Sequence, residues 1–325
     1  SFPLSDQDSL GHYSYLLKLY ISGGSFSAGN MLMHGKIPLL HTALVTFLAY
    51  FGTFEVSSIF NFYLLLLIIL SLYKMCKIFS GKYKISSNQF YLIVCVLLAS
   101  PLLSFIVSTG RPYVMITCFC TLLLHFLLEN FEKRKSDSLY IVFFALLGGA
   151  LVSSNQLGLA VFGSLFIALL ISNYSPCIWN KSIQLILVGG LLVAVYALPF
   201  YLRVYFLTGD LLGGVQGLEF PVNEFAGFLG IAKSLFIISS RHSQMGNSQC
   251  MGILYLSFLP ILSIAIVKRR LWEERKGLFL LVFIILCYAV WLTKIPQTRS
   301  LMSVFPPYLL LLYLLIDLRK RLYKY

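Results

Sequence analysis

Three side chains that could take part in acid–base chemistry lie within seven residues near the start of the chain: Asp6, Asp8 and His12. A carboxylate can take a proton from an attacking hydroxyl. The spacing of the two aspartates also resembles a metal-binding pair, but no further oxygen ligands stand nearby. The sequence therefore favours an acid–base site here over a divalent metal site, and no motif indicates a bound cofactor.

The rest of the chain has the composition of a membrane protein. Of its 325 residues 58% are hydrophobic and only 11% are charged, with a mean hydropathy of +0.84, whereas soluble domains carry about 25% charged residues. The net charge of +13 does not indicate nucleic-acid binding, because the basic residues are not interleaved with surface aromatics. The composition predicts an all-α polytopic integral membrane protein.

The pattern of apolar runs divides the chain into four parts. Residues 1–55 form a polar first loop, whose apolar segment 37–51 is too short to cross a bilayer and is expected to lie at the interface. Residues 56–205 and 250–325 hold transmembrane helices on either side of a large loop, 206–249. About nine spans are predicted, at 56–73, 89–108, 112–128, 139–153, 157–172, 183–205, 250–267, 277–293 and 300–316.

The distribution of basic residues sets the orientation. If 37–51 does not cross and the chain turns back at Ser153–Gln156, most of the 25 basic residues fall on one side of the membrane. That side is cytoplasmic by the positive-inside rule. The first loop and the loop 206–249 are then extracytoplasmic. Reading 139–172 as one kinked helix breaks this pattern, so a turn is predicted at Ser153–Gln156.

This orientation collects cations beside the two carboxylates on the outer face. They come from separate segments of the chain: Lys36, Arg111, Lys294 and Arg299, with the polar side chain of His34 close to Lys36. Arginine binds phosphate as a fork and lysine as a point charge, so the set suits an anionic, membrane-embedded substrate. The alternative is that Arg111 and Arg299 only anchor helix ends at lipid headgroups.

The order of several short motifs resembles a known family, the GT-C-fold glycosyltransferases of the protein mannosyltransferase and aminoarabinose transferase type. These enzymes use polyprenyl-phosphate sugars outside the cytoplasm. The motifs are the acidic pair Asp6/Asp8, Lys36-Ile37-Pro38-Leu39 with Phe51-Gly52 at the end of its segment, Gly110-Arg111-Pro112-Tyr113, the Gly-rich helix from Leu147-Gly148-Gly149 to Gln156-Leu157-Gly158, and Arg299 with Pro306-Pro307. The resemblance covers residues 1–172 in order and 294–316 more loosely.

The resemblance implies inverting transfer of a sugar from a polyprenyl-phosphate carrier to a lipid, glycan or protein acceptor. Asp8 or Asp6 would be the general base, because Ser9 stands where many members have Glu and both aspartates remain candidates. Lys36, Arg111, Arg299 and Lys294 would bind the lipid phosphate, and His12, Tyr13 and His34 would line the sugar and acceptor site. The chain would lack the family's first helix and lie in a bacterial inner membrane with its site facing outward.

Two other functions fit parts of the sequence. A lipid-linked-glycan flippase or transporter should place ionisable residues at the midplane of its spans, whereas the charges here lie at the ends of the apolar runs. An O-antigen polymerase or ligase should carry an Arg-rich large loop, whereas 206–249 has only Lys233 and Arg241 as basic residues. Both comparisons favour the glycosyltransferase.

Overall fold

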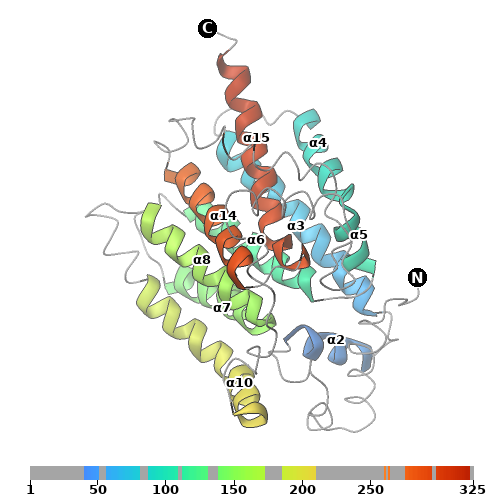
Figure 1. Ribbon diagram of the computed structural model, residues 1–325, viewed down its shortest axis with the longest axis vertical. Coiled ribbons are helices and arrows are strands. Elements are labelled where there is room, and N and C mark those ends of the chain that lie inside the picture. Colours follow the sequence, from blue (N-terminus) through green and yellow to red (C-terminus); the bar gives the residue numbers. More distant parts are fainter. Residues whose placement is uncertain are drawn as a thin grey trace.

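The protein is helical throughout the residues that the structure, a computed structural model, describes: 40–50, 56–80, 87–108, 112–130, 138–172, 185–209, 275–294, 298–322 and the single residues 260 and 263. No strand occurs in these residues, which confirms the predicted all-α class. The elements (Figure 1) are α2 (Leu40–Tyr50), α3 (Val56–Ser80), α4 (Ser87–Leu98), α5 (Pro101–Ser108), α6 (Tyr113–Asn130), α7 (Ser138–Ser154), α8 (Gln156–Ser172), the π-helical turn η4 (Leu185–Gly189), α10 (Gly190–Thr208), α14 (Arg275–Lys294), the 3₁₀ helix η8 (Thr298–Val304) and α15 (Phe305–Leu322).

Each predicted span that falls within these ranges coincides with a helix or a helix pair. The helix that begins at residue 56 runs beyond the predicted end at 73, because Lys74 and Lys77 are good helix formers that remain exposed. Helix α10 continues through Pro199 and ends where Gly209, at a φ of 73°, donates its N–H to the Tyr205 carbonyl. Nearly all of the predicted span 250–267 and of the loop 206–249 lies outside the described residues.

The predicted span 89–108 is two helices. Helix α4 ends at Leu98 and α5 begins at Pro101, and the two axes are bent by 65°. Proline has no N–H to donate and its ring clashes with the carbonyl one turn back, so a helix breaks before it. The Ala99 and Ser100 N–H groups bond back to the Cys95 and Leu97 carbonyls, which closes α4 before the bend.

Helix α2 is too short to cross a membrane. Its 11 residues span roughly 16 Å, about half of the hydrocarbon core. It packs on α3 and α7, with Leu40, His41 and Val45 buried and Phe47 64% exposed. That 37–51 does not cross the bilayer and that it lies at the interface both stay predictions.

The polar break after α7 is a turn, as the charge pattern predicts. Helices α7 and α8 pack against each other and run side by side in Figure 1. Asn155 caps α8: its Oδ1 accepts from the Leu157 N–H at 3.4 Å and its carbonyl accepts from the Gly158 N–H at 2.8 Å. Side-chain caps of this kind satisfy the first N–H groups of a helix, which have no partner within it.

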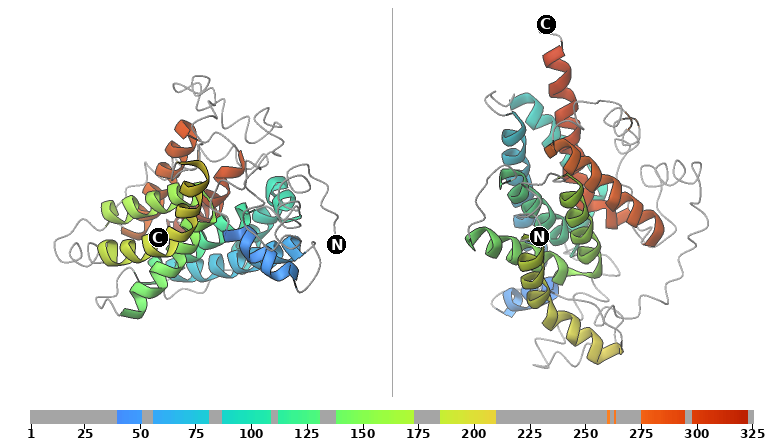
Figure 2. Two further views of the ribbon diagram at one scale, coloured as in Figure 1. Left: turned by 90° about the horizontal axis from the view of Figure 1, so that it is seen from below. Right: turned by 90° about the vertical axis from the view of Figure 1, so that its left-hand side faces the viewer.

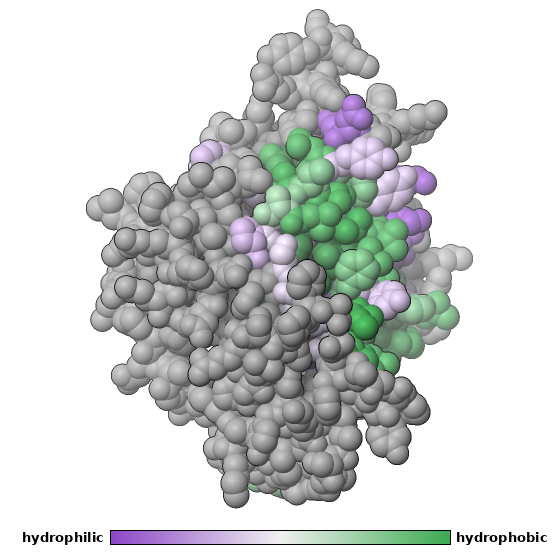
Figure 3. Space-filling view, turned by 90° about the vertical axis from the view of Figure 1, so that its right-hand side faces the viewer, coloured by the Kyte–Doolittle hydropathy of each residue, from purple (hydrophilic) through white to green (hydrophobic). Residues whose placement is uncertain are grey.

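The surface of the bundle indicates burial in a membrane. Helix α6 and η8 are enclosed, whereas α3, α4 and α10 expose large apolar side chains to the outside, among them Phe62, Tyr91 and Leu191. Figure 3 shows an apolar face with hydrophilic side chains toward its upper end. By length and composition α3, α6 and Leu187–Phe206 could each cross a bilayer, and the bent pair α4–α5 makes a fourth candidate within the described ranges. The chain is an integral membrane protein.

The helices alternate between the two ends of the long axis of the bundle, which is vertical in Figure 1 and in the right panel of Figure 2. At one end, called the α2 end, α2 lies near the start of α3, the end of α5, the start of α6 and the α7–α8 turn. At the opposite end, called the basic end, α3 and α15 end and α14 begins. Basic residues in those turns include Lys74, Lys77, Arg275, Lys276 and Arg319–Arg321. This distribution follows the predicted alternation.

The tight α7–α8 turn makes a testable prediction at Gly158. A Cβ at this position would overlap the main-chain carbonyl of Leu151, so Gly158→Ala forces the two helices apart. We expect a loss of roughly 1–3 kcal/mol of stability, as for other overpacked sites, measured as a lower melting temperature in detergent. Gly163→Ala on the same helix is the matched control, because a Cβ there meets nothing within 4 Å. Equal melting temperatures for the two variants would contradict this account.

Candidate active site at the α2 end

Helices α3 and α5 are joined at the α2 end by side chains of α3 that donate hydrogen bonds to main-chain carbonyls of α5. The last four carbonyls of a helix have no partner within it, and α5 ends at Ser108. Ser58 Oγ donates to the Ser108 carbonyl at 2.7 Å, and Asn61 Nδ2 donates to the Ile106 carbonyl at 3.3 Å. Two side chains from the first turns of α3 therefore satisfy the end of α5, and they fix the entry to the turn that leads to α6.

A buried histidine extends this network to α2. His41 is 2% exposed, and its Nε2 lies 3.4 Å from Oδ1 of Asn61. Its ring also lies 6.0 Å from the ring of Phe60, centroid to centroid. Because Asn61 Nδ2 donates to a carbonyl, which can only accept, Asn61 Oδ1 faces the histidine and Nε2 must carry the proton. Three segments of the chain, α2, α3 and α5, thus meet through one asparagine.

The environment keeps His41 neutral. Burial lowers its pKa from 6.5 to about 4, and the hydrogen bond to Asn61 opposes this only in part. In the neutral Nε2–H form the second ring nitrogen, Nδ1, is an acceptor, and within the described part of the chain it has no hydrogen-bond partner. Protonation would place a buried N–H there without an acceptor, which agrees with the lowered pKa.

The 3₁₀ helix η8 is anchored inside the bundle. Cys120 Sγ of α6 donates to the Ser303 carbonyl at 3.7 Å, and η8 also packs on α14 and α15. The Ser303 hydroxyl is buried without a hydrogen-bond partner in the described ranges, as is the Ser153 hydroxyl at the end of α7. Pro306 and Pro307 lie in the first turn of α15, a position where a helix tolerates proline. The backbone of Arg299 therefore belongs to a helix, η8, that packs on α6, α14 and α15.

Most residues of the predicted site lie outside the described residues. These are Asp6, Asp8, His12, Tyr13, His34 and Lys36, which precede α2, and Arg111, which precedes Pro112 and α6. The backbone of Lys294 ends α14 and that of Arg299 lies in η8. Their assigned roles therefore stay predictions, as does the absence of a metal. The structure shows that the described segments next to Lys36 and Arg111 meet at the α2 end.

The residues that join these segments were not among those predicted from the sequence. A histidine in an apolar run is usually a packing residue, yet His41 forms the link between α2 and α3. The available signal was its position five residues after Lys36, together with Asn61, an amide in the otherwise apolar first half of α3.

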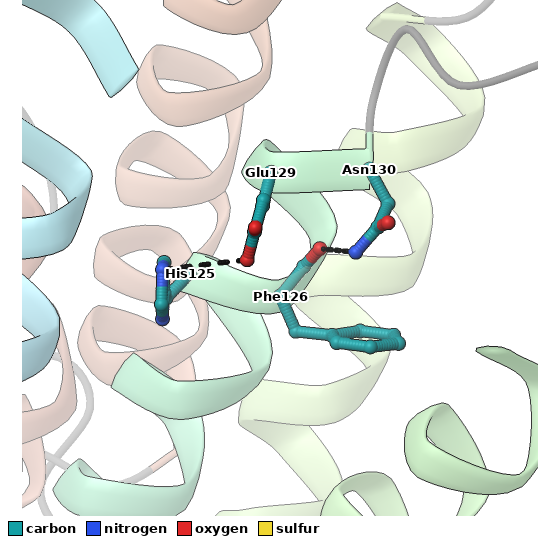
Figure 4. A network of polar contacts seen from close by, with 4 residues as sticks. All are labelled: His125, Phe126, Glu129 and Asn130. Carbon is teal, nitrogen blue, oxygen red and sulfur yellow. Dashed lines mark hydrogen bonds and ion pairs between the residues drawn. The ribbon is translucent and has the colours of Figure 1, made fainter. Parts of the chain in front are cut away.

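A second polar group lies at the basic end, away from this site. His125 Nε2 approaches Glu129 at 3.7 Å one turn along α6, and Asn130 Nδ2 donates to the Phe126 carbonyl at 2.8 Å (Figure 4). Both contacts lie within the last turns of one helix, where side chains commonly satisfy the free carbonyls. Among the described residues, no three His, Cys, Asp or Glu side chains group in a manner that could hold a metal.

The buried neutral state of His41 predicts an acid-dependent stability. The His41 side chain binds a proton near pH 6.5 in the unfolded chain and only near pH 4 in the folded chain. The stability that depends on neutral His41 is therefore complete above pH 6.5 and is lost as the pH falls toward 4. The loss amounts to about 3 kcal/mol at most. In His41→Gln the amide keeps a donor for Asn61 and does not titrate. We expect its melting temperature to fall less than that of the wild type between pH 7 and pH 4.5, and parallel curves would contradict the assignment.

Comparison with known proteins identifies the fold. No protein-family model and no curated protein matches the sequence. Among solved structures, the chain matches ArnT from Cupriavidus metallidurans bound to undecaprenyl phosphate, with a TM-score of 0.58 and 17% sequence identity, over 97% of this chain and 56% of that chain. The apo state of the same protein matches with a TM-score of 0.55 and 16% identity, over 94% and 54%.

The chain thus spans about half the length of the solved chains that it resembles. At this level of identity the likeness concerns the arrangement of the helices and not the chemistry. It nevertheless extends over almost all of the present chain. The chain has the GT-C fold of ArnT, as the order of its sequence motifs indicates.

Proposed function

We propose that the chain belongs to a membrane glycosyltransferase that moves a sugar from a polyprenyl-phosphate carrier to an acceptor. The observation that carries the proposal is the meeting, at one end of an ArnT-like fold, of the segments adjoining Lys36 and Arg111. The solved ArnT binds undecaprenyl phosphate, which supports a lipid phosphate as the ligand here. A fold alone does not assign a reaction, so the proposal also depends on the cations and carboxylates predicted for this site.

The reaction takes place on the extracytoplasmic side. The basic end carries the described clusters of Lys and Arg, and such clusters remain in the cytoplasm. The α2 end then faces outward, in a bacterial inner membrane. The polyprenyl chain stays in the bilayer beside the apolar helices, and its phosphate reaches the headgroup level at this end.

The lipid phosphate is bound by Lys36, Arg111, Arg299 and Lys294. The chain from Ser108 to Arg111 is three residues long and can span at most roughly 11 Å, which supports a place for Arg111 at the α2 end. Arginine presents paired N–H donors to phosphate oxygens, and lysine adds a compact charge. These cations stabilise the negative charge that develops on the phosphate as its bond to the sugar breaks.

The acceptor is activated by Asp8 or Asp6. As the acceptor oxygen or nitrogen attacks the anomeric carbon, the carboxylate takes its proton and the bond to the phosphate breaks on the opposite face of the sugar. The result is inversion, with the bonding electrons leaving on the lipid phosphate. His12, Tyr13 and His34 line the sugar and acceptor site, and the nearby cations keep the carboxylate ionised.

The described spans support an enzyme over a transporter. Their buried polar side chains are Ser, Thr, Asn and Gln together with His41, and no Asp, Glu, Lys or Arg is buried in the described ranges. A transporter that moves a charged lipid-linked glycan would place such residues along its path. The charges of this chain instead favour chemistry at one surface.

Binding of undecaprenyl phosphate tests the phosphate site. Lys36→Ala, Arg111→Ala and Arg299→Ala each remove a charge-assisted contact, so we expect each to weaken binding by roughly 1.5–3 kcal/mol. The measurement is titration of the purified chain in nanodiscs, followed by native mass spectrometry. Lys77→Ala is the control, because Lys77 is an exposed cation at the basic end. Wild-type affinity in all three variants would mean that these residues only anchor helix ends.

Single-turnover transfer tests the base. A positioned carboxylate contributes roughly 10²–10⁴-fold to proton transfer in such a step. We expect Asp8→Asn to keep donor binding and to lose turnover by this factor, with a smaller loss for Asp6→Asn. The measurement is transfer from a polyprenyl-phosphate sugar in liposomes, with Glu129→Gln at the basic end as a control. A larger loss in Asp6→Asn exchanges the two roles, and unchanged rates in both variants would remove the base from this stretch.

A further inference from the structure

One asparagine lies between the two segments that carry proposed phosphate ligands. Lys36 precedes His41 by five residues, and Arg111 follows Ile106 by five residues. Asn61 accepts from His41 Nε2 at 3.4 Å on one side and donates to the Ile106 carbonyl at 3.3 Å on the other. Lys36 and Arg111 stand 75 positions apart in the sequence. The hydrogen bonds of Asn61 to His41 and to Ile106 connect the helices next to them.

We propose that His41 and Asn61 form a positioning brace that sets the spacing of the Lys36 and Arg111 segments for one phosphate group. The inference rests on the proposed function and deepens it, since it assigns what orients the phosphate-binding cations. His41 and Asn61 do not touch the reacting atoms. They act through the backbone that carries the charged residues on either side of the ligand.

The chemistry of the contact explains why a histidine occupies this position. Burying an imidazole costs more than burying a leucine, and much of that cost is recovered only through its hydrogen bonds. An apolar side chain could fill the space beside Phe60 without that cost. The polar ring supplies a directional bond to Asn61, which fixes the first turn of α2 against α3 more narrowly than packing does.

The brace sits where a small movement matters. A bidentate arginine and a lysine must meet the same phosphate within hydrogen-bond distance, so a shift of about 1 Å between their segments weakens both contacts. Ser58 and Asn61 hold the end of α5 to α3, and His41 holds the start of α2 to the same helix. Loss of the histidine bond frees the Lys36 segment while the α5 side remains attached.

Three substitutions of one residue separate the brace from general packing. Gln places an amide nitrogen near the position of Nε2 and can donate to Asn61. Asn carries the same amide group on a shorter side chain, near the position of Nδ1, and cannot reach Asn61. Leu fills the space without a donor. His125→Leu, a half-buried histidine at the basic end, controls for the loss of a histidine elsewhere.

The experiment uses the full chain in nanodiscs with undecaprenyl phosphate as the probe, together with hydrogen exchange of the backbone amides. We expect His41→Asn and His41→Leu to bind the lipid about tenfold more weakly, and His41→Gln and His125→Leu to stay within about threefold of the wild type. Exchange should rise in 40–48 and 104–108 for Asn and Leu only, with α14 unchanged. If His41→Leu does not fold, the comparison of Gln with Asn decides.

Other results would overturn the brace. Wild-type affinity in His41→Asn, or equal losses in Gln and Asn, would show that the bond to Asn61 does not set the site. A rise in exchange across α14 and α10 as well would show general destabilisation instead. If the wild type itself does not bind the lipid, the proposed function fails, and the phosphate-positioning role fails with it. Exchange then shows separately whether His41 and Asn61 hold the two segments together.

Discussion

The hydrocarbon core of a membrane offers no water to main-chain N–H and C=O groups, and this constraint shapes the whole protein. Regular helices satisfy the groups within each span, so the remaining difficulty is at the breaks. Each described break has a local solution. Asn155 caps α8, Gly209 closes α10, and the carbonyls at the end of α5 accept from Ser58 and Asn61 of α3. These polar side chains thus occur where the backbone needs them.

Close packing completes what the backbone bonds begin. Between helices in lipid, contact depends on van der Waals fit, and small residues let the helices approach closely. In α7 a Cβ on Gly148 would meet Phe162 and Val193, and one on Gly149 would meet Tyr196. Helices α8 and α10 therefore lie close against α7. The α7–α8 turn lies at the same end of the bundle as α2, which also packs on α7.

The division of charge between the two ends connects the fold with the proposed chemistry. Among the described residues, no Asp, Glu, Lys or Arg is buried within the bundle. Cations at the edge of a low-dielectric body act more strongly on a phosphate than the same cations in water. A lipid phosphate is delivered to this edge by its own hydrocarbon chain. The likeness to ArnT concerns the arrangement of the helices, and under the proposed function the site residues would determine which sugar and acceptor are used.

Features that depend on composition and on counting residues along the chain could be predicted from the sequence. Apolar runs predicted the described helices, and charge alternation distinguished a turn at Ser153–Gln156 from a kink. The length of 37–51 predicted that it does not cross. The membrane class and the order of motifs behind the fold also followed from sequence alone. These features are local, or they follow from the bilayer as a common external reference.

The bend at Pro101 and the contacts of His41 could be seen only in the folded structure, because they depend on packing between segments that are distant in the sequence. Pro101 is present in the sequence, but the apolar run continues through it, so 89–108 was predicted as one span. The direction of the 65° bend depends on the packing of α5 against α3 and α6. The role of His41 was hidden for the same reason. Its partner Asn61 lies 20 residues away, on another helix, and Ile106 lies 45 further on. Hydrogen bonds over such separations leave no periodic pattern, because the spacing that matters lies across the fold and not along the chain.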